Sequence, residues 1–201
     1  HSGLLRHIYV RKGFVSGEIM VCLVANGREI PFSAELIENL KAEIDGLKSV
    51  ILNINTQKTN VVLGSECVTL YGSDYITDVL CGLKFNISPL SFYQVNHDGA
   101  EILYSKAKEY AGLTGNETLI DLYCGTGTIG LSMAKKAKKL IGIEIIPDAV
   151  KNAAANAERA GIENAEFICA DAGKAALELA ARGIRPDVII VDPPRKGITD
   201  D

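Results

Sequence analysis

The pattern of apolar and polar positions changes near residues 88–89 of the chain. Before that point, short apolar or alternating runs are separated by turn residues, which is typical of β-strands. Residues 33–47 instead repeat apolar side chains at helical spacing, with Ser33 as the expected N-cap, and Asn26-Gly27 is a strong hairpin-turn signal. Strands are predicted at residues 8–11, 18–25, 50–55, 60–63, 67–71, 75–80 and 83–86. We therefore expect a small α+β domain with a mostly antiparallel sheet, spanning residues 1–88.

From residue 89 onward, helical and strand patterns alternate along the chain. The pattern predicts strands at residues 118–122, 140–143, 166–169 and 188–191, and helices at residues 98–111, 127–137, 147–160 and 173–182. Strands separated by helices of this length form a parallel sheet with helices on its faces. Residues 89–201 are therefore predicted to form a second domain of the α/β class. Doubly wound sheets commonly contain more than four strands, so we expect this one to be incomplete at its C-terminal end.

Composition narrows the class of protein. Of 201 residues, 47% are apolar and 23% are charged, as in ordinary soluble proteins. No run approaches the roughly 18 apolar residues of a membrane helix, and no signal peptide is recognisable. The five cysteines are scattered without a Cys-x-x-Cys pair, which argues against a zinc site and favours reduced thiols in the cytoplasm. A net charge of -4 argues against nucleic-acid binding by the whole surface, although it allows a local basic patch.

A glycine-rich turn follows the first strand of the second domain. Asp121 ends that strand, and Tyr123, Gly125, Gly127 and Thr128 lead into a helix. Glycines are needed where the chain turns sharply and where the backbone lies against a ligand. Such a turn can also be purely structural, so its meaning depends on the strand ends beside it.

The next strand ends in Glu144, at about the 20-residue spacing expected of a carboxylate that accepts the ribose hydroxyls of an adenosine. A solvated strand-end carboxylate is the other interpretation. Gly125, Gly127 and Gly130 also match the dinucleotide spacing, which keeps NAD as an alternative. Asp121 would repel a pyrophosphate, however, whereas it can pair with the ammonium group of S-adenosylmethionine. The turn therefore favours S-adenosylmethionine as the cofactor.

The third and fourth strands also end in carboxylates. Asp171 is placed to accept from the adenine amino group, or to cap the following helix, or to do both. Asp192 precedes two prolines, which fix the backbone as a rigid arch at the carboxyl edge of the sheet. Arg195 follows the prolines, where a cation suits an RNA phosphate or a base carbonyl. A proline-terminated strand with solvated cations is the alternative interpretation.

Taken together, residues 88–97, 121–127, 142–144 and 192–197 resemble the RNA uracil-5-methyltransferases, which act on ribosomal or transfer RNA. The resemblance implies a Rossmann-like S-adenosylmethionine-dependent methyltransferase domain preceded by a small α+β domain. It implies contacts to the cofactor from Gln94, Tyr123, Glu144 and Asp192. Asp171 and Thr128 are less certain contacts. From the residues alone, a hydrogen bond at the helix start explains Gln94 equally well, and core packing is the other explanation for Tyr123.

The resemblance also implies the chemistry. In this family a cysteine thiolate adds to carbon 6 of a uracil, carbon 5 takes the methyl group, and a base removes the carbon 5 proton. The family's nucleophile and its base, a glutamate, are expected beyond Asp201, so no catalytic residue is assigned within this chain. We expect a C-terminally truncated methyltransferase domain that binds the cofactor without methylating RNA. Ribosomal RNA, and 23S RNA in particular, is favoured over transfer RNA.

A cluster of cations opens the first domain and is the candidate RNA contact there. Its members are Arg6, His7, Arg11 and Lys12. Phosphate contacts and a solvated strand pair are both consistent with this cluster. Two other functions remain open from the residues: methylation of an RNA base amino group or guanine, and a noncatalytic module that binds an adenosine ligand or RNA. No metal site and no membrane contact are expected.

Overall fold

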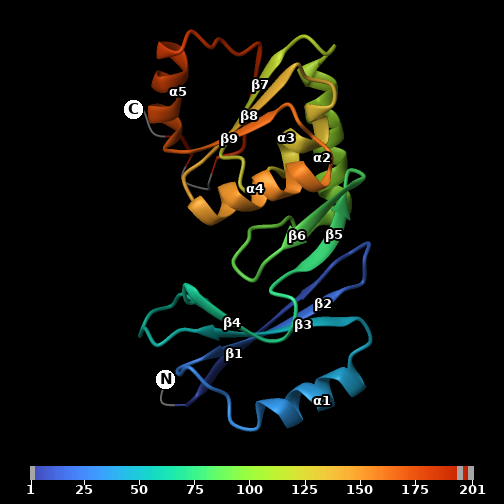
Figure 1. Cartoon of the computed structure of the whole chain (residues 1–201), viewed down its shortest axis with the longest axis vertical. Coiled ribbons are helices and arrows are strands. Elements are labelled where there is room, and N and C mark those ends of the chain that lie inside the picture. Colours follow the sequence, from blue (N-terminus) through green and yellow to red (C-terminus); the bar gives the residue numbers. More distant parts are fainter. Residues whose placement is uncertain (1–2, 194–196, 199–201) are drawn as a thin grey trace. The chain divides into compact units, whose positions relative to one another are not determined.

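The computed structural model describes residues 3–193 and 197–198 of the chain (Figure 1). The described chain forms two compact units. The first comprises the chain up to Val79 together with Asn86–Ser91, and the second comprises Leu80–Phe85 together with the chain from Phe92 onward. A two-stranded sheet, formed by β5 (Ile76–Leu80) and β6 (Leu83–Ile87), contributes to both units.

The first unit is a four-stranded sheet in the order β1-β2-β3-β4, with one helix against one face (Figure 1). β1 (Leu5–Lys12) pairs antiparallel with β2 (Ile19–Ala25), and β3 (Leu47–Ile54) pairs antiparallel with β4 (Glu66–Gly72), which confirms a mostly antiparallel sheet. β2 and β3 are parallel. The helix α1 (Ser33–Glu43) connects them, and its apolar side chains pack on Val21, Leu23 and Val50.

Four local predictions for the first unit are wrong. The helix ends at Glu43 rather than residue 47, and its N-cap is Phe32 in a left-handed conformation, not Ser33. Asn26-Gly27 makes no hairpin, because β3 pairs parallel with β2 and the chain must cross over through α1. Residues 60–63 form no strand. The buried Asn55 amide donates to the carbonyls of Val61 and Val62 instead, so a side chain replaces the sheet ladder there.

The second unit contains the predicted parallel sheet, and its strand order is β10-β7-β8-β9. The strands are β7 (Thr118–Leu122), β8 (Lys139–Glu144), β9 (Ala165–Cys169) and β10 (Val188–Val191). The helices are α2 (His97–Ala111), α3 (Thr128–Ala134), α4 (Pro147–Arg159) and α5 (Ala172–Ala181). Leu119 and Leu140 pack with α2, α3 and α4, whereas Ile120 and Ile141 pack with α5, so helices cover both faces of the sheet (Figure 1).

The strand order positions the site. From β7 the chain passes to β8 and β9 on one side and then returns to β10 on the other side of β7. Ligands of parallel α/β sheets bind outside the carboxyl ends of the strands at such a reversal. β7 ends next to Tyr123, and β10 ends next to Asp192. The fold therefore brings the glycine turn and the Asp192 segment to the same edge of the sheet.

Candidate functional site

Three carboxylates converge on the glycine turn at the carboxyl edge of the second unit. Asp121 lies at the end of β7, Glu144 ends β8, and Asp192 follows β10. The carboxylates of Asp192 and Glu144 both raise the pKa of Asp121, which shows that they lie close enough to interact with it. No cation among the described residues forms an ion pair with any of these three side chains. The carboxyl edge of the sheet therefore carries negative charge that no described cation pairs with, which favours a cationic ligand.

Asp121 is almost completely buried, with 1% of its surface exposed. Its Oδ2 accepts a hydrogen bond from the Gly130 N–H at 2.8 Å, whereas its buried Oδ1 has no partner within the described structure. Burial raises the pKa of Asp121 to about 7 from 3.8, against the lowering effect of the Gly130 hydrogen bond. Buried polar atoms without partners are rare and costly, so Oδ1 indicates a place where a ligand donor, directly or through water, completes the structure.

The backbone of the glycine turn takes conformations that glycine favours. Gly125 and Gly127 have φ values of 55° and 81°. A Cβ at Gly125 would meet nothing within 4 Å, so the backbone there faces open space that a ligand can approach closely. Tyr123 also has a positive φ, 63°. That conformation is unfavourable for a residue with a side chain and tends to occur at functional sites.

Glu144 is half-buried, and its carboxylate holds the turn in place. One oxygen accepts from the Gly125 N–H at 3.0 Å, and the other accepts from the Ile146 N–H at 2.9 Å. Glu144 is thus neither a freely solvated strand end nor detached from the turn. Since each carboxylate oxygen has two acceptor sites, both oxygens retain capacity to accept from ribose hydroxyls.

Gln94 and Thr128 are brought together through a residue that the sequence did not single out. The Tyr104 hydroxyl lies 3.1 Å from Thr128 Oγ1, and it also hydrogen-bonds the Gln94 side chain. The start of α2 is capped by Asn96, whose side chain accepts from the Gly99 N–H. Capping therefore explains Asn96, while the Gln94 amide is directed to the tyrosine beside the glycine turn.

A second residue missed by sequence reasoning is Asn156 on α4. It is 1% exposed, and its amide donates to the Thr126 carbonyl in the glycine turn at 2.9 Å. A polar residue in an alanine-rich helix carries no sequence signal of such a role. Glu144 and Asn156 therefore tie the glycine turn to the end of β8 and to α4.

The remaining predicted residues lie at the expected strand ends. Asp171 is exposed and caps α5, accepting from the N–H groups of Gly173 and Lys174. This confirms the capping interpretation and leaves its second oxygen for other partners. Asp192 is exposed and interacts electrostatically with both Asp121 and Tyr104. Arg195 lies outside the described residues.

Comparison with known proteins agrees with this architecture. A family model described as a methyltransferase domain matches residues 113–194. The chain is 51% identical over 196 residues to an uncharacterized RNA methyltransferase of Clostridium acetobutylicum and 48% identical over 197 residues to one of Clostridium tetani. Each alignment covers 98% of this chain but 43% of the relative, so the chain spans less than half the length of these relatives.

Among solved structures, the tRNA (uracil-54, C5)-methyltransferase of Pyrococcus abyssi, in complex with S-adenosyl-L-homocysteine, matches with a TM-score of 0.77 and 28% identity. The match covers 99% of this chain and 46% of that one. The second unit has the Rossmann-like fold of S-adenosylmethionine-dependent methyltransferases. The tRNA-bound structure named aTrm5 aligns at a TM-score of 0.55 with 16% identity, which supports the fold alone.

Two cysteines of the second unit, Cys81 and Cys124, have thiols whose pKa is raised. Cys124 lies in the glycine turn, is 7% exposed, and has its pKa raised, chiefly by burial and further by the carboxylates of Asp121 and Glu144. Burial also raises the pKa of Cys81. Because the thiolate is the nucleophilic form, neither thiol is suited to attack a substrate.

Within residues 3–193 and 197–198, no cluster of His, Cys, Asp or Glu could hold a metal ion.

In the unit that precedes the methyltransferase fold, two of the predicted RNA contacts are engaged internally. The Arg6 guanidinium donates to the backbone carbonyls of Asn55, Gln57 and Thr59. Arg11 donates to the Tyr9 hydroxyl and to the Ser91 carbonyl. Lys12 is exposed at the end of β1.

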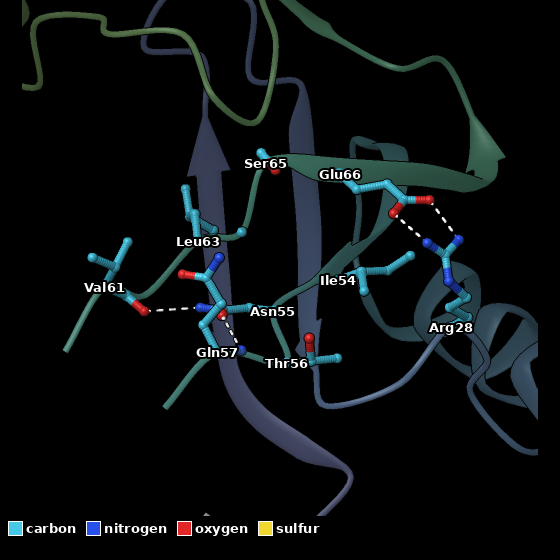
Figure 2. Close-up of a pocket in the computed structure, with 10 residues that line it drawn as sticks. Arg28, Ile54, Asn55, Thr56, Gln57, Val61, Leu63, Ser65 and Glu66 are labelled. Atoms are coloured by element: carbon cyan, nitrogen blue, oxygen red, sulfur yellow. Dashed lines mark hydrogen bonds and ion pairs between the residues drawn. The ribbon is translucent and has the colours of Figure 1, made fainter. Parts of the chain in front are cut away.

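The segment that Arg6 holds borders a cavity of about 420 Å³ (Figure 2). In Figure 2, the Asn55 amide points to the Val61 carbonyl, and two residues that line the cavity, Arg28 and Glu66, form an ion pair with two hydrogen bonds. Buried amides therefore fix an irregular loop in this unit.

None of the helices in the described part of the chain is long and apolar enough to cross a membrane.

Proposed function

We propose that this chain is the cofactor-binding part of an RNA methyltransferase that transfers a methyl group from S-adenosylmethionine to carbon 5 of a uridine. The observation that carries the cofactor assignment is the buried, partnerless Oδ1 of Asp121 within a set of three unneutralised carboxylates. A ligand with an ammonium and a sulfonium group compensates that charge, whereas the pyrophosphate of NAD would add to it. The similarity to the Pyrococcus abyssi enzyme supports the uridine and carbon 5.

The residues present fit the cofactor in three places. The Asp121 and Gln94 side chains would receive the methionine end, since a carboxylate accepts from an ammonium and an amide can donate to a carboxylate. Glu144 would accept from the ribose hydroxyls beside the open backbone of Gly125. Asp171 would accept from the adenine amino group while capping α5.

Asp192, Tyr123 and Thr128 complete the proposed site. Asp192 and the proline after it would border the end of the cofactor that carries the methyl group, since β10 lies next to β7 in the sheet. Tyr123 would line the cofactor from the strained start of the turn. The cofactor supplies an electrophilic methyl group, and these residues hold it and exclude water from it.

Addition to carbon 6 of a uracil requires a thiolate. In four of the five cysteines, Cys22, Cys67, Cys81 and Cys124, burial raises the pKa of the thiol. The fifth, Cys169, ends β9 at the opposite edge of the sheet from β10, and its thiol lies 3.7 Å from the Ile145 carbonyl. We therefore propose that the 201-residue chain binds the donor but does not by itself turn over an RNA substrate. Lys12 would contact RNA phosphates, and Arg6 and Arg11 would shape the surface around it.

The test measures transfer of a radiolabelled methyl group to unmodified 23S ribosomal RNA and to unmodified transfer RNA, followed by nucleoside analysis. The gene's full reading frame and the 201-residue chain are assayed in parallel. We expect 5-methyluridine in ribosomal RNA from the former and no turnover from the latter. Product in transfer RNA alone would correct the substrate class. A methylated guanine or base amino group would overturn the assignment to uridine.

A further inference from the structure

Tyr104 reaches the donor site from the core of the second unit. It lies on the buried face of α2, and its side chain is 2% exposed within the apolar cluster that α2 shares with α3 and the sheet. The length of the side chain carries its oxygen across that core to the first residue of α3, where it lies 3.1 Å from Thr128 Oγ1. A leucine or phenylalanine would fill the same space, so packing alone does not explain the hydroxyl.

The hydroxyl connects two segments that are far apart in the sequence. Besides Thr128, it hydrogen-bonds the side chain of Gln94, which precedes α2. It also lies within electrostatic range of the Asp121 and Asp192 carboxylates. The phenol therefore adjoins the residues that are proposed to bind the methionine end of the cofactor. An amide has a donor end and an acceptor end, so a bond from one end to a fixed phenol decides which end faces the ligand.

We propose that Tyr104 is a positioning residue of the donor site, whose hydroxyl orients the Gln94 amide and the Thr128 hydroxyl toward the methionine end of S-adenosylmethionine. This inference rests on the proposed function, because it assigns a role within the same site. Tyr104 acts through its two partners and does not itself contact the cofactor. Without the phenol, the Gln94 amide would be free to rotate, and the ligand would have to order it on binding.

The first experiment compares S-adenosylhomocysteine binding by calorimetry in Tyr104→Phe and in wild type. The substitution keeps the buried ring and removes one oxygen, and we expect the Kd to rise about tenfold, as for the loss of one or two neutral hydrogen bonds. Tyr110→Phe, on the same helix but 83% exposed, is the matched control and should bind like wild type. Thr128→Val, which removes the other partner without altering the core, should also weaken binding.

A double-mutant cycle separates positioning from simple stability. If Tyr104 acts largely through Gln94, adding Tyr104→Phe to Gln94→Ala should change the Kd by less than about twofold. Fully additive losses would overturn the inference, as would wild-type affinity in Tyr104→Phe. A merely structural role would lower the denaturation midpoint and leave the Kd of the folded protein unchanged. Absence of binding by wild type would instead refute the proposed function.

Discussion

The Gly130 N–H donates to Oδ2 of Asp121 at 2.8 Å, and this bond ties the first turns of α3 to the end of β7. There is no room for a side chain at Gly130, because a Cβ there would lie 2.8 Å from the same carboxylate oxygen. The bond stabilises the charged form of Asp121, yet burial outweighs it and raises the pKa to about 7. A cationic ligand group paired with Asp121 would therefore lower this pKa and hold the carboxylate in its charged form.

The raised pKa predicts how stability depends on pH. Below about pH 4 Asp121 is protonated in both the folded and unfolded states, so its contribution to folding is fully present there. Between about pH 4 and pH 7, the carboxyl group ionises in the unfolded state while it stays largely protonated in the folded state. Ionisation therefore stabilises the unfolded state, and the contribution to folding is lost. One pKa unit corresponds to about 1.4 kcal/mol. We therefore expect Asp121→Asn to gain up to a few kcal/mol over wild type between about pH 4 and pH 8.

Urea unfolding at several pH values measures this difference. Asp148→Asn, whose side chain is 83% exposed and pairs with Lys151 at 3.6 Å, serves as the control. Its free-energy difference from wild type should be small and should not change between about pH 5 and pH 8. A constant free-energy difference between Asp121→Asn and wild type across this range would contradict the burial argument.

Two glycines of the second unit should respond differently to alanine. At Gly142 a Cβ would lie 2.5 Å from a Phe167 ring carbon, so Gly142→Ala is expected to lower the free energy of unfolding by about 1–3 kcal/mol. At Gly125 a Cβ meets open space, although the φ of 55° costs about 1 kcal/mol or more. Gly125→Ala should therefore chiefly weaken S-adenosylhomocysteine binding. Unfolding curves and calorimetry on both variants measure these effects. A smaller loss in the free energy of unfolding for Gly142→Ala than for Gly125→Ala would contradict this prediction.

The Asp78 side chain holds the turn between β1 and β2 in the first unit by hydrogen bonds. Its buried carboxylate accepts from the N–H groups of Phe14, Val15 and Ser16. Asp78→Ala is expected to destabilise the first unit by about 1–3 kcal/mol, because these donors lose a charged acceptor. Hydrogen exchange of the three amides should accelerate, while exposed Asp74→Ala leaves it unchanged. Unaltered exchange in Asp78→Ala would show that the turn holds without the carboxylate.

RNA binding should distinguish Lys12 from Arg6. Lys12 is exposed, so Lys12→Ala is expected to weaken RNA binding and to reduce the salt dependence of the affinity by about one counterion. Arg6 is bonded to three backbone carbonyls, so Arg6→Ala should loosen residues 55–59 and alter the salt dependence less. Filter binding over a series of salt concentrations measures both slopes. Equal slopes for wild type and Lys12→Ala would remove Lys12 from the interface.

Much of the second unit follows from the sequence because its signals are local. Short apolar runs predict β7 and β8, and helical spacing after the glycine turn predicts α3. Acidic residues mark the ends of the strands. Tyr104 and Asn156 were not predicted, because their roles depend on where a helix face meets the glycine turn. Residues 60–63 were assigned to a strand on their apolar character. The carbonyls of Val61 and Val62 accept instead from the Asn55 amide, a contact across the loop that no periodicity in the sequence reveals.

The most direct test of the account is a calorimetric titration of the chain with S-adenosylhomocysteine and, separately, with NAD, repeated on Glu144→Ala. Glu144→Ala removes both the proposed ribose acceptor and the bond to the Gly125 N–H. Exposed Glu158→Ala on α4 is the control. We expect wild type to bind S-adenosylhomocysteine and not NAD, with affinity at least tenfold weaker in Glu144→Ala alone. Tighter binding of NAD, or unchanged affinity in Glu144→Ala, would contradict the assignment of this edge as a methyl-donor site.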